Sequence, residues 1–183
     1  IDFGCGAGID VILAALKVGS SGKVVGVDGA PQMIECAKQA VAEANLTDMV
    51  ELHVDDMERL ELPDGFADVV ISNCVINLCP DKEAVYREAF RILRPGGRLA
   101  VSDIAYTEKV DHQVQGRFHS TWAGCVGGAV DEDSYFDIVR KADFRQVKVV
   151  ASHQLHQKEL EAMACCPGSE VSPIPEKEDL AAI

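Results

Sequence analysis

Three alternating glycines near the start of the chain have the type and spacing of a ligand-binding turn. Gly4, Gly6 and Gly8 follow an apolar start that predicts the end of a buried strand. Glycines in such a turn let the backbone approach a ligand without a Cβ in the way. The apolar residues that follow are spaced as one buried helix face, and they are Ile9, Ile12, Leu13 and Leu16. We expect the unpaired N–H groups at the start of that helix to face a polar ligand.

The spacing of these glycines does not fit the dinucleotide-binding pattern, glycine-x-glycine-x-x-glycine. Counted from Gly4, the third glycine would fall on Ile9, and counted from Gly6 it would fall on Val11. Asp2 instead stands two residues before the first glycine. The run Asp-x-Gly-x-Gly-x-Gly resembles the first motif of class I S-adenosylmethionine (SAM) methyltransferases. An ordinary glycine-rich turn is the competing interpretation.

A carboxylate at the end of the next apolar run predicts the position of a ribose. Residues 24–28 end in Asp28, about 20 residues beyond the glycine turn, where nucleotide-binding folds place an acid for ribose hydroxyls. A carboxylate accepts two hydrogen bonds from neighbouring hydroxyls, which suits a cis-diol. An ordinary strand-end acid is the alternative, and the glycine turn upstream favours the ribose contact.

Further candidates for cofactor binding lie at other strand and helix ends. Met33, in the first turn of a helix expected from Pro31, would pack on an adenine face or simply in the core. The resemblance to the SAM superfamily implies that Asp56, with Met57 beside it, meets the adenine amino edge. A solvated turn is an equally good interpretation of that loop. Asn73 ends a later apolar strand, and carboxyl ends of parallel strands line ligand crevices, so we expect it near the cofactor.

Strand and helix patterns alternate along the chain and predict an α/β fold. The expected strands cover residues 24–28, 50–54, 66–72, 98–103 and 146–151. Helices are expected from Pro31, from Pro80 and from Asp131. This alternation is typical of a Rossmann-like, mostly parallel sheet with helices on both faces. We assign residues 1–151 to this domain, with a substrate-side insert at 105–130, and 152–183 to an extension whose tail we expect to be disordered from about residue 167.

Composition narrows the function classes further. The chain has 183 residues, enough for one domain with a full core, and 48% of them are hydrophobic. The formal net charge of −13 argues against nucleic acid as a partner. No apolar run approaches the roughly 20 residues that span a bilayer, so no membrane partner is expected. Seven cysteines outside a disulfide scaffold suggest reduced thiols in a cytoplasm. The chain starts without Met inside an expected strand, so we interpret it as a fragment.

Four short stretches together resemble the arsenite methyltransferases. They are Asn73-Cys74-Val75-Ile76-Asn77-Leu78, Pro95-Gly96-Gly97, Ser102-Asp103-Ile104 and Trp122-Ala123-Gly124-Cys125. The likeness runs from residue 1 to about residue 150, and its specific parts are the two cysteine motifs. It implies a class I methyltransferase fold that binds SAM and transfers its methyl group to trivalent arsenic. It also implies that Cys74 and Cys125 are the catalytic thiolates that hold the arsenic.

The reaction that the resemblance implies agrees with the chemistry of trivalent arsenic and of thiolates. Trivalent arsenic is soft and thiophilic, so thiolates suit it, by extension of the rule for soft metals. Its lone pair is the nucleophile and the sulfonium methyl the electrophile, and no general base is needed. The protein mainly has to hold arsenic in line with the methyl carbon. The expected substrate is arsenite or its thiol conjugates, as in arsenic detoxification, with glutathione or thioredoxin as the thiol reductant.

The other cysteines leave the third arsenic ligand open. Relatives usually carry a further cysteine upstream of the glycine motif, so here Cys79 or free glutathione would supply the third thiol. Cys79 precedes Pro80 at an expected helix N-terminus. Cys165 and Cys166 could be a reductant pair or a spare thiol site. Relatives also usually end with one more, antiparallel strand, and residues after 151 offer no convincing candidate.

Two other functions compete with arsenic methylation. One is SAM-dependent methylation of a small organic acceptor such as a quinone, which would leave Cys74 and Cys125 as packing residues, the usual role of a free cysteine. The other is a truncated module that binds SAM or arsenite without turnover. Serine at both cysteines would abolish arsenic methylation but spare an organic acceptor, and turnover would exclude the binding module.

Overall fold

The computed structural model describes residues 1–109 and 126–155. The elements in chain order are β1 (Asp2–Phe3), α1 (Ile9–Val18), the 3-10 turn η1 (Gly19–Ser21), β2 (Val24–Asp28), α2 (Pro31–Glu43), β3 (Val50–Val54), β4 (Ala67–Asn73), the 3-10 turn η2 (Ile76–Leu78), α3 (Lys82–Ile92), β5 (Leu93–Ser102) and α5 (Glu132–Lys141). The chain divides into two compact units. The first comprises residues 1–76 and 81–102, and the second comprises 77–80 with the described residues from 103 on.

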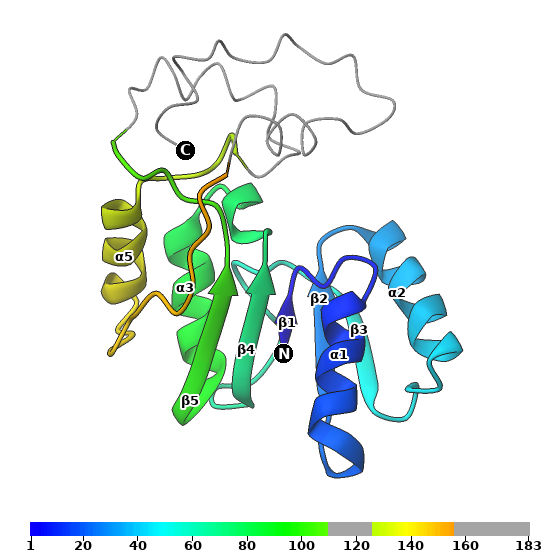
Figure 1. Ribbon diagram of the computed structural model, residues 1–183. Helices are drawn as coiled ribbons and strands as arrows, with labels where there is room; N and C mark the ends of the chain where they lie inside the picture. Colours follow the sequence, from blue (N-terminus) through cyan, green and yellow to red (C-terminus); the bar gives the residue numbers. More distant parts are fainter. Residues whose placement is uncertain (110–125, 156–183) are drawn as a thin grey trace, which may run out of the picture. The chain divides into compact units, whose positions relative to one another are not determined.

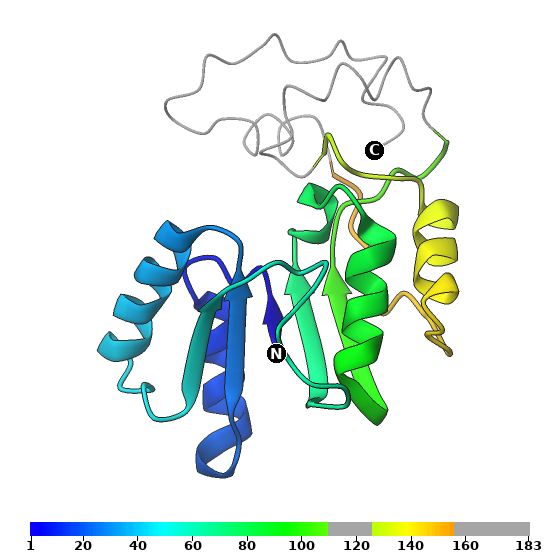
Figure 2. The ribbon, with the colours of Figure 1, turned by 180° about the vertical axis from the view of Figure 1, so that it is seen from behind.

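The first unit is a parallel five-stranded sheet in the order β3-β2-β1-β4-β5. Crossovers between parallel strands are right-handed, so the face on which a connecting helix lies depends on the side of the sheet to which the chain adds its next strand. The chain adds β2 and β3 on one side of β1, and β4 and β5 on the other side. Accordingly α1 and α3 lie on opposite faces of the sheet (Figures 1 and 2). The order reverses between β1 and β4, which is the point where open α/β sheets bind ligands.

The core lies around β1, β2 and the inner face of α2. Phe3 and Val27 are fully buried, as expected for strands covered on both faces. The apolar spacing in α2 predicts a buried stripe of Ile34, Ala37, Val41 and Ala44. The first three are buried, whereas Ala44 is exposed because it lies at the C-cap, beyond the last helical residue. Pro31 opens this helix, and its N-cap residue has no side-chain capping bond. The sheet and helix pattern predicted from the sequence is therefore confirmed in this part.

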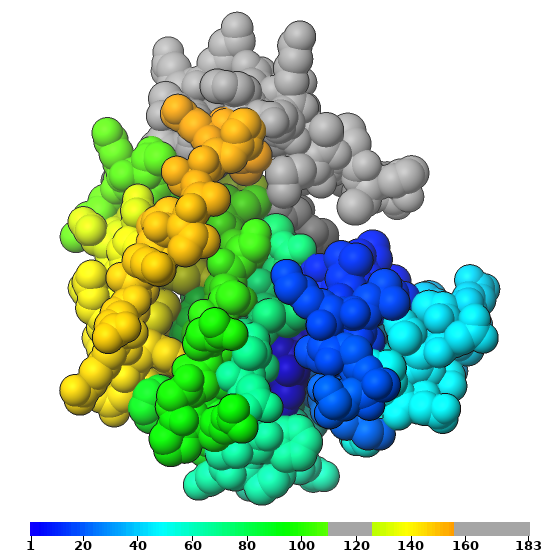
Figure 3. Space-filling model, turned by 60° about the horizontal axis from the view of Figure 1, so that its bottom comes forward, coloured from blue at the N-terminus to red at the C-terminus, as the bar shows by residue number. Residues whose placement is uncertain are grey.

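The buried face of α1 differs from the prediction. Val11 and Ala15 face the core, whereas Ile9, Leu13 and Leu16 are 71%, 58% and 66% exposed. The space-filling view shows α1 on the surface of its unit (Figure 3, blue). A Cβ built on Gly26 would lie 2.9 Å from Val11 Cγ2, so α1 packs on β2 through this small contact. The helix is apolar nearly all round, and periodicity alone therefore selected the wrong side.

Two predicted strands also change. β5 begins at Leu93 and not at Arg98, and the register shifts between Ala67 and Val69 opposite that added stretch. Residues 146–151 are not a strand. Val150 in this segment is 85% exposed, and among the described residues no strand pairs with it, so it has no ladder of hydrogen bonds.

The second unit contains α5, which begins as predicted. The side chain of Asp131 accepts a hydrogen bond from the Ser134 N–H at 3.0 Å and caps the helix. Tyr135 on α5 donates to Asp103 Oδ2 at 3.2 Å. Within the described residues, no helix has the length and apolar character needed to cross a membrane.

Candidate functional site

The glycine turn at the end of β1 has a left-handed backbone at each glycine. The φ angles are 68° at Gly4, 50° at Gly6 and 91° at Gly8. A Cβ at Gly4 would lie 2.3 Å from Val75 Cγ2, so β4's exit segment packs directly onto this turn. A Cβ at Gly6 would meet nothing within 4 Å. Packing thus requires glycine at position 4, and position 6 faces open space that a ligand can fill.

Asp28 is bonded to the glycine turn. Its Oδ2 accepts from the Gly6 N–H at 2.9 Å, and its Oδ1 accepts from the Ala30 N–H at 2.8 Å. The carboxylate therefore holds the end of β2, the glycine turn and the start of α2 together. Each oxygen keeps a further lone pair, so the ribose contact predicted for Asp28 stays a prediction that this geometry allows.

Asp2 is a buried acid directly before the turn. It is 2% exposed, and no hydrogen-bond partner for its Oδ2 is found among the described residues. Burial, together with the negative charges of Asp10 and Asp28, raises the pKa of Asp2 to about 7. A buried polar atom without a partner calls for a water or a ligand group to satisfy it.

The end of β4 brings two more predicted residues to the same edge of the sheet. Asn73 Nδ2 donates to Asp10 Oδ2 at 3.2 Å, which ties β4 to the first turn of α1. Cys74 is half-buried, and its N–H donates to the Ser102 carbonyl at 2.8 Å. Its φ of 55° is uncommon for a residue with a Cβ, and such backbone strain clusters at functional sites.

A cleft of about 450 Å³ opens where β2 and β3 end. Its lining residues are Gly29, Val54, Asp55, Asp56 and Met57. Two of the predicted cofactor residues, Asp56 and Met57, thus line one cleft. Met33 is 43% exposed and is not part of this lining, so its contact with adenine stays a prediction.

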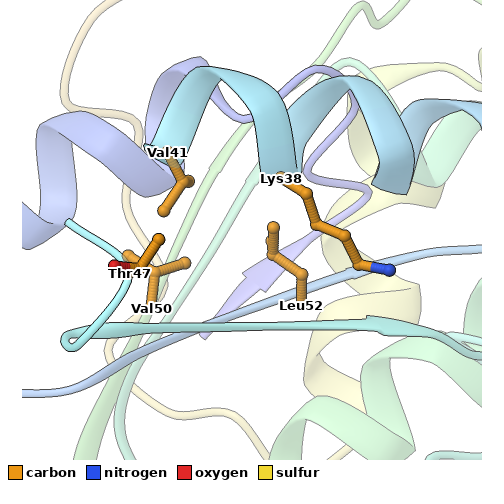
Figure 4. A pocket seen from close by; sticks show the side chains of 5 residues that line it. All are labelled: Lys38, Val41, Thr47, Val50 and Leu52. Atoms are coloured by element: carbon orange, nitrogen blue, oxygen red, sulfur yellow. The ribbon is translucent and has the colours of Figure 1, made fainter. Parts of the chain in front are cut away.

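A smaller hollow of about 210 Å³ lies between α2 and β3 (Figure 4). It is lined by Lys38, Val41, Thr47, Val50 and Leu52. The Lys38 ammonium pairs with Glu35 Oε1 at 2.6 Å, so its charge is directed to that partner. The hollow contains none of the predicted site residues, and it is smaller than ordinary ligand pockets. We therefore place the candidate site at the carboxyl edge of the sheet.

The cysteines differ strongly in their surroundings. Cys5 is buried, and burial raises the pKa of its thiol to about 12, as is typical of a packing cysteine. Cys36 is exposed on α2, and Cys79 is buried. Cys125, Cys165 and Cys166 lie outside the described residues, so the pairing of Cys74 with Cys125 stays a prediction.

Sequence reasoning missed two acids of this site. Asp10 contacts Asn73, and Asp55 lines the cleft, with its N–H donating to the Asp28 carbonyl at 3.2 Å. Both carry a sequence signal that went unused. Asp10 follows the last glycine in the first turn of α1, and Asp55 directly follows β3.

The strand order, the glycine turn after β1 and the acid at the end of β2 define the fold of class I SAM-dependent methyltransferases. Residues 1–162 match the methyltransferase domain family, and the chain belongs to it.

Among its relatives, the chain is similar to arsenite methyltransferases. It is 42% identical to that of Halobacterium salinarum, over 81% of this chain and 38% of the relative. It is 30% identical to that of Homo sapiens, over 88% of this chain and 45% of the relative. The chain thus spans less than half the length of these curated relatives.

A solved structure supports the same relationship. The chain is 35% identical to an arsenic(III) S-adenosylmethionine methyltransferase from Chlamydomonas reinhardtii, with a TM-score of 0.74. The match covers 88% of this chain and 57% of that one.

Proposed function

We propose that this chain is the methyl-transferring domain of a SAM-dependent arsenite methyltransferase. The observation that carries the proposal is the position of Cys74. Its neighbour Val75 packs against Gly4, so the thiol-bearing residue follows β4 at the point where β4 meets the glycine turn. The similarity to arsenite methyltransferases supports the choice of arsenic as the acceptor.

The residues around the turn fit SAM in three ways. Open space at Gly6 admits a ligand, the orphaned Asp2 oxygen offers it a buried acceptor, and the cleft beside Asp56 has room for a nucleoside. We assign the glycine turn to the amino acid end, Asp28 to the ribose and Asp56 with Met57 to adenine. When bound, SAM supplies a sulfonium methyl group as the electrophile.

The charges of this edge suit a cationic methyl donor. The negative charges of Asp10 and Asp28 lie close enough to Asp2 to contribute, after burial, to its raised pKa. A site crowded with carboxylates attracts a positive ligand and gains from its binding. A sulfonium with an ammonium group is such a ligand. The same acids would repel free anionic acceptors, and arsenite is neutral as its acid at neutral pH.

The substrate in this proposal is trivalent arsenic bound by the Cys74 and Cys125 thiolates. Thiolates hold this soft atom while its lone pair stays free. The chain's task is orientation, because a fixed in-line approach supplies much of the rate in such transfers. The bond between Cys74 N–H and the Ser102 carbonyl fixes the backbone that carries one of the two thiols. Glutathione or thioredoxin would supply reducing thiols in a cytoplasm.

Substitution of Cys74 tests this function. With SAM, arsenite and glutathione, Cys74→Ser should lose at least about 100-fold in methylated arsenic, because one soft ligand is gone. Its affinity for S-adenosylhomocysteine should stay within about twofold of wild type, because the cofactor contacts lie elsewhere. Cys36→Ser, on the exposed side of α2, is the matched control and should keep full activity.

The competing functions give different results in the same assay. Methylation of a quinone that survives Cys74→Ser would favour an organic acceptor. Binding of SAM and arsenite by the wild-type chain without any methylated product would favour a binding module.

A further inference from the structure

The connection from β3 to β4 has no helix to hold it. Parallel strands are usually joined through a helix, yet residues 55–66 are described throughout and form only turns, bends and an isolated bridge between Asp56 and Arg59. This connection carries Asp55, Asp56 and Met57, which line the candidate nucleoside cleft. The shape of the cleft wall therefore depends on whatever fixes an irregular segment.

Arg91 of α3 is the main contact that fixes this segment. Its Nη1 donates to the Leu62 carbonyl at 2.7 Å and to Asp64 Oδ1 at 2.6 Å. Its Nη2 donates to the Leu60 carbonyl at 3.2 Å. The Arg91 carbonyl accepts from the Gly65 N–H at 3.0 Å. One guanidinium thus reaches alternate residues of the connection, which a flexible ammonium would not do.

Glu88, one turn earlier on α3, completes the contact. It is 9% exposed, and its two oxygens accept from Arg91 Nη2 at 2.5 Å and Nε at 2.9 Å. Its Oε1 also accepts from the Leu60 N–H at 2.7 Å. The Arg91 hydrogen bonds hold the pKa of Glu88 below its usual range. Both backbone groups of Leu60 are therefore bonded to this pair.

From Leu60 the constraint passes to the cleft in one step. The next residue, Glu61, donates its N–H to Asp55 Oδ2 at 3.1 Å, and Asp55 Oδ1 accepts from the Asp56 N–H at 2.8 Å. Asp55 is also held at its own N–H by the Asp28 carbonyl. The acids of the cleft wall are thus fixed between the end of β2 and the Glu88–Arg91 pair.

We propose that Glu88 and Arg91 are positioning residues for the nucleoside end of the cofactor, which rests on the SAM site proposed above. They touch no ligand themselves. They fix Leu60, and through Glu61 they fix the Asp55–Met57 wall against which the adenine lies. The pair determines how well the cleft recognises adenine, and it does not act on the amino acid end at the glycine turn.

The test compares two ligands that differ by the base. S-adenosylhomocysteine has adenine, whereas S-ribosylhomocysteine has the same ribose and amino acid without it. In Glu88→Gln, which keeps the size of the side chain, and in Arg91→Lys, which keeps the charge, S-adenosylhomocysteine should bind on the order of tenfold more weakly. The affinity for S-ribosylhomocysteine, followed by ligand-observed NMR, should change by less than about twofold.

Arg87→Gln is the matched control. Arg87 lies on the same helix and pairs with Asp81 and Glu83 at 3.7 Å. Among the described residues it makes no bond of its own to the 55–66 connection, whose Glu58 Oε1 accepts from the Asp81 backbone N–H at 3.1 Å. This variant removes one positive charge from α3 and should leave both affinities at the wild-type values. Amide hydrogen exchange at Leu60 and Glu61 should be faster in the Glu88 and Arg91 variants than in the Arg87 variant.

The outcomes separate the two proposals. If the Glu88 and Arg91 variants lost affinity for both ligands equally, the pair would only stabilise the fold. If the affinity for S-adenosylhomocysteine were unchanged while exchange at Leu60 became faster, adenine binding would not depend on the pair. Either result overturns the positioning role. If the wild-type chain bound no S-adenosylhomocysteine at all, the SAM site itself would be wrong.

Discussion

At the scale of single residues, position in the backbone decides the role more than residue type does. Gly4 and Gly6 belong to one motif, yet one is fixed by packing against Val75 and the other faces open space. Cys5 and Cys74 are both thiols, but the first is buried and the second lies at a strained turn beside the glycine loop. The motif was readable from the sequence, and these distinctions were not, because they depend on neighbours distant in the chain.

Alanine at the two glycines should therefore affect stability and cofactor binding to different extents. Gly4→Ala should lower the free energy of unfolding by roughly 3 kcal/mol, from the clash with Val75 added to left-handed strain. Gly6→Ala should cost about 1–2 kcal/mol, from strain alone, but should lose most affinity for S-adenosylhomocysteine, because its Cβ enters the ligand space. Urea unfolding and calorimetry check the pair. Normal binding by folded Gly6→Ala would contradict the assignment of that space.

Asp2 predicts a pH dependence of stability. Burial raises its pKa to about 7 in the folded chain, above the ordinary value of 3.8. Between these two pH values the unfolded chain has released the proton that the folded chain keeps, so stability falls as pH rises.

Asp2→Asn removes that decline. Its stability gain over wild type should grow from pH 4 to pH 7 and then level off, at about 1.4 kcal/mol for each unit of the pKa shift. Thermal melts at several pH values measure it, with the exposed Asp48→Asn as control. If the melting temperatures of Asp2→Asn and wild type differed by the same amount at every pH, Asp2 would have an ordinary pKa in the folded chain.

At the scale of elements, regular patterns were predictable where one face is apolar and the other polar. The α2 stripe, the buried strands and the Asp131 cap follow directly from the sequence. The face of α1 was wrong because that helix is apolar nearly all round, and Gly26 on β2 decides which side packs. Residues 146–151 alternate like a strand, but a strand forms only with a partner. The contact of Glu88 and Arg91 with residues 60–64 could not be predicted, because these segments are distant in the sequence and only the fold brings them together.

The α1 result makes a matched pair of substitutions informative. Val11 is fully buried and Leu13 is 58% exposed. Val11→Ala should cost about 2 kcal/mol of unfolding free energy, because it leaves a cavity against β2. Leu13→Ala should cost less than about 0.5 kcal/mol, as surface changes do. A larger loss at Leu13 than at Val11 in urea unfolding would show that the face predicted from periodicity is the buried one.

At the scale of the whole molecule, the parallel sheet brings the glycine turn and a thiol to one edge. β1 delivers the glycines, β2 delivers Asp28, and β4 delivers Asn73 and Cys74. The fold class and most of these positions were predictable, because strand ends of a parallel sheet meet at one edge. The partner thiol at Cys125 is not among the described residues, and the chain spans less than half of its curated relatives.

A single-turnover experiment tests whether Cys74 holds the arsenic that receives the methyl group of SAM. The chain is loaded with arsenite, mixed with a stoichiometric amount of methyl-labelled SAM, and the label on arsenic is measured against time in wild type and Cys74→Ser. Wild type should yield labelled methylarsenic, and Cys74→Ser, which still binds S-adenosylhomocysteine, should label arsenic at least about 100-fold more slowly. Labelling of arsenic at the wild-type rate by Cys74→Ser would contradict a role for this thiol in holding arsenic.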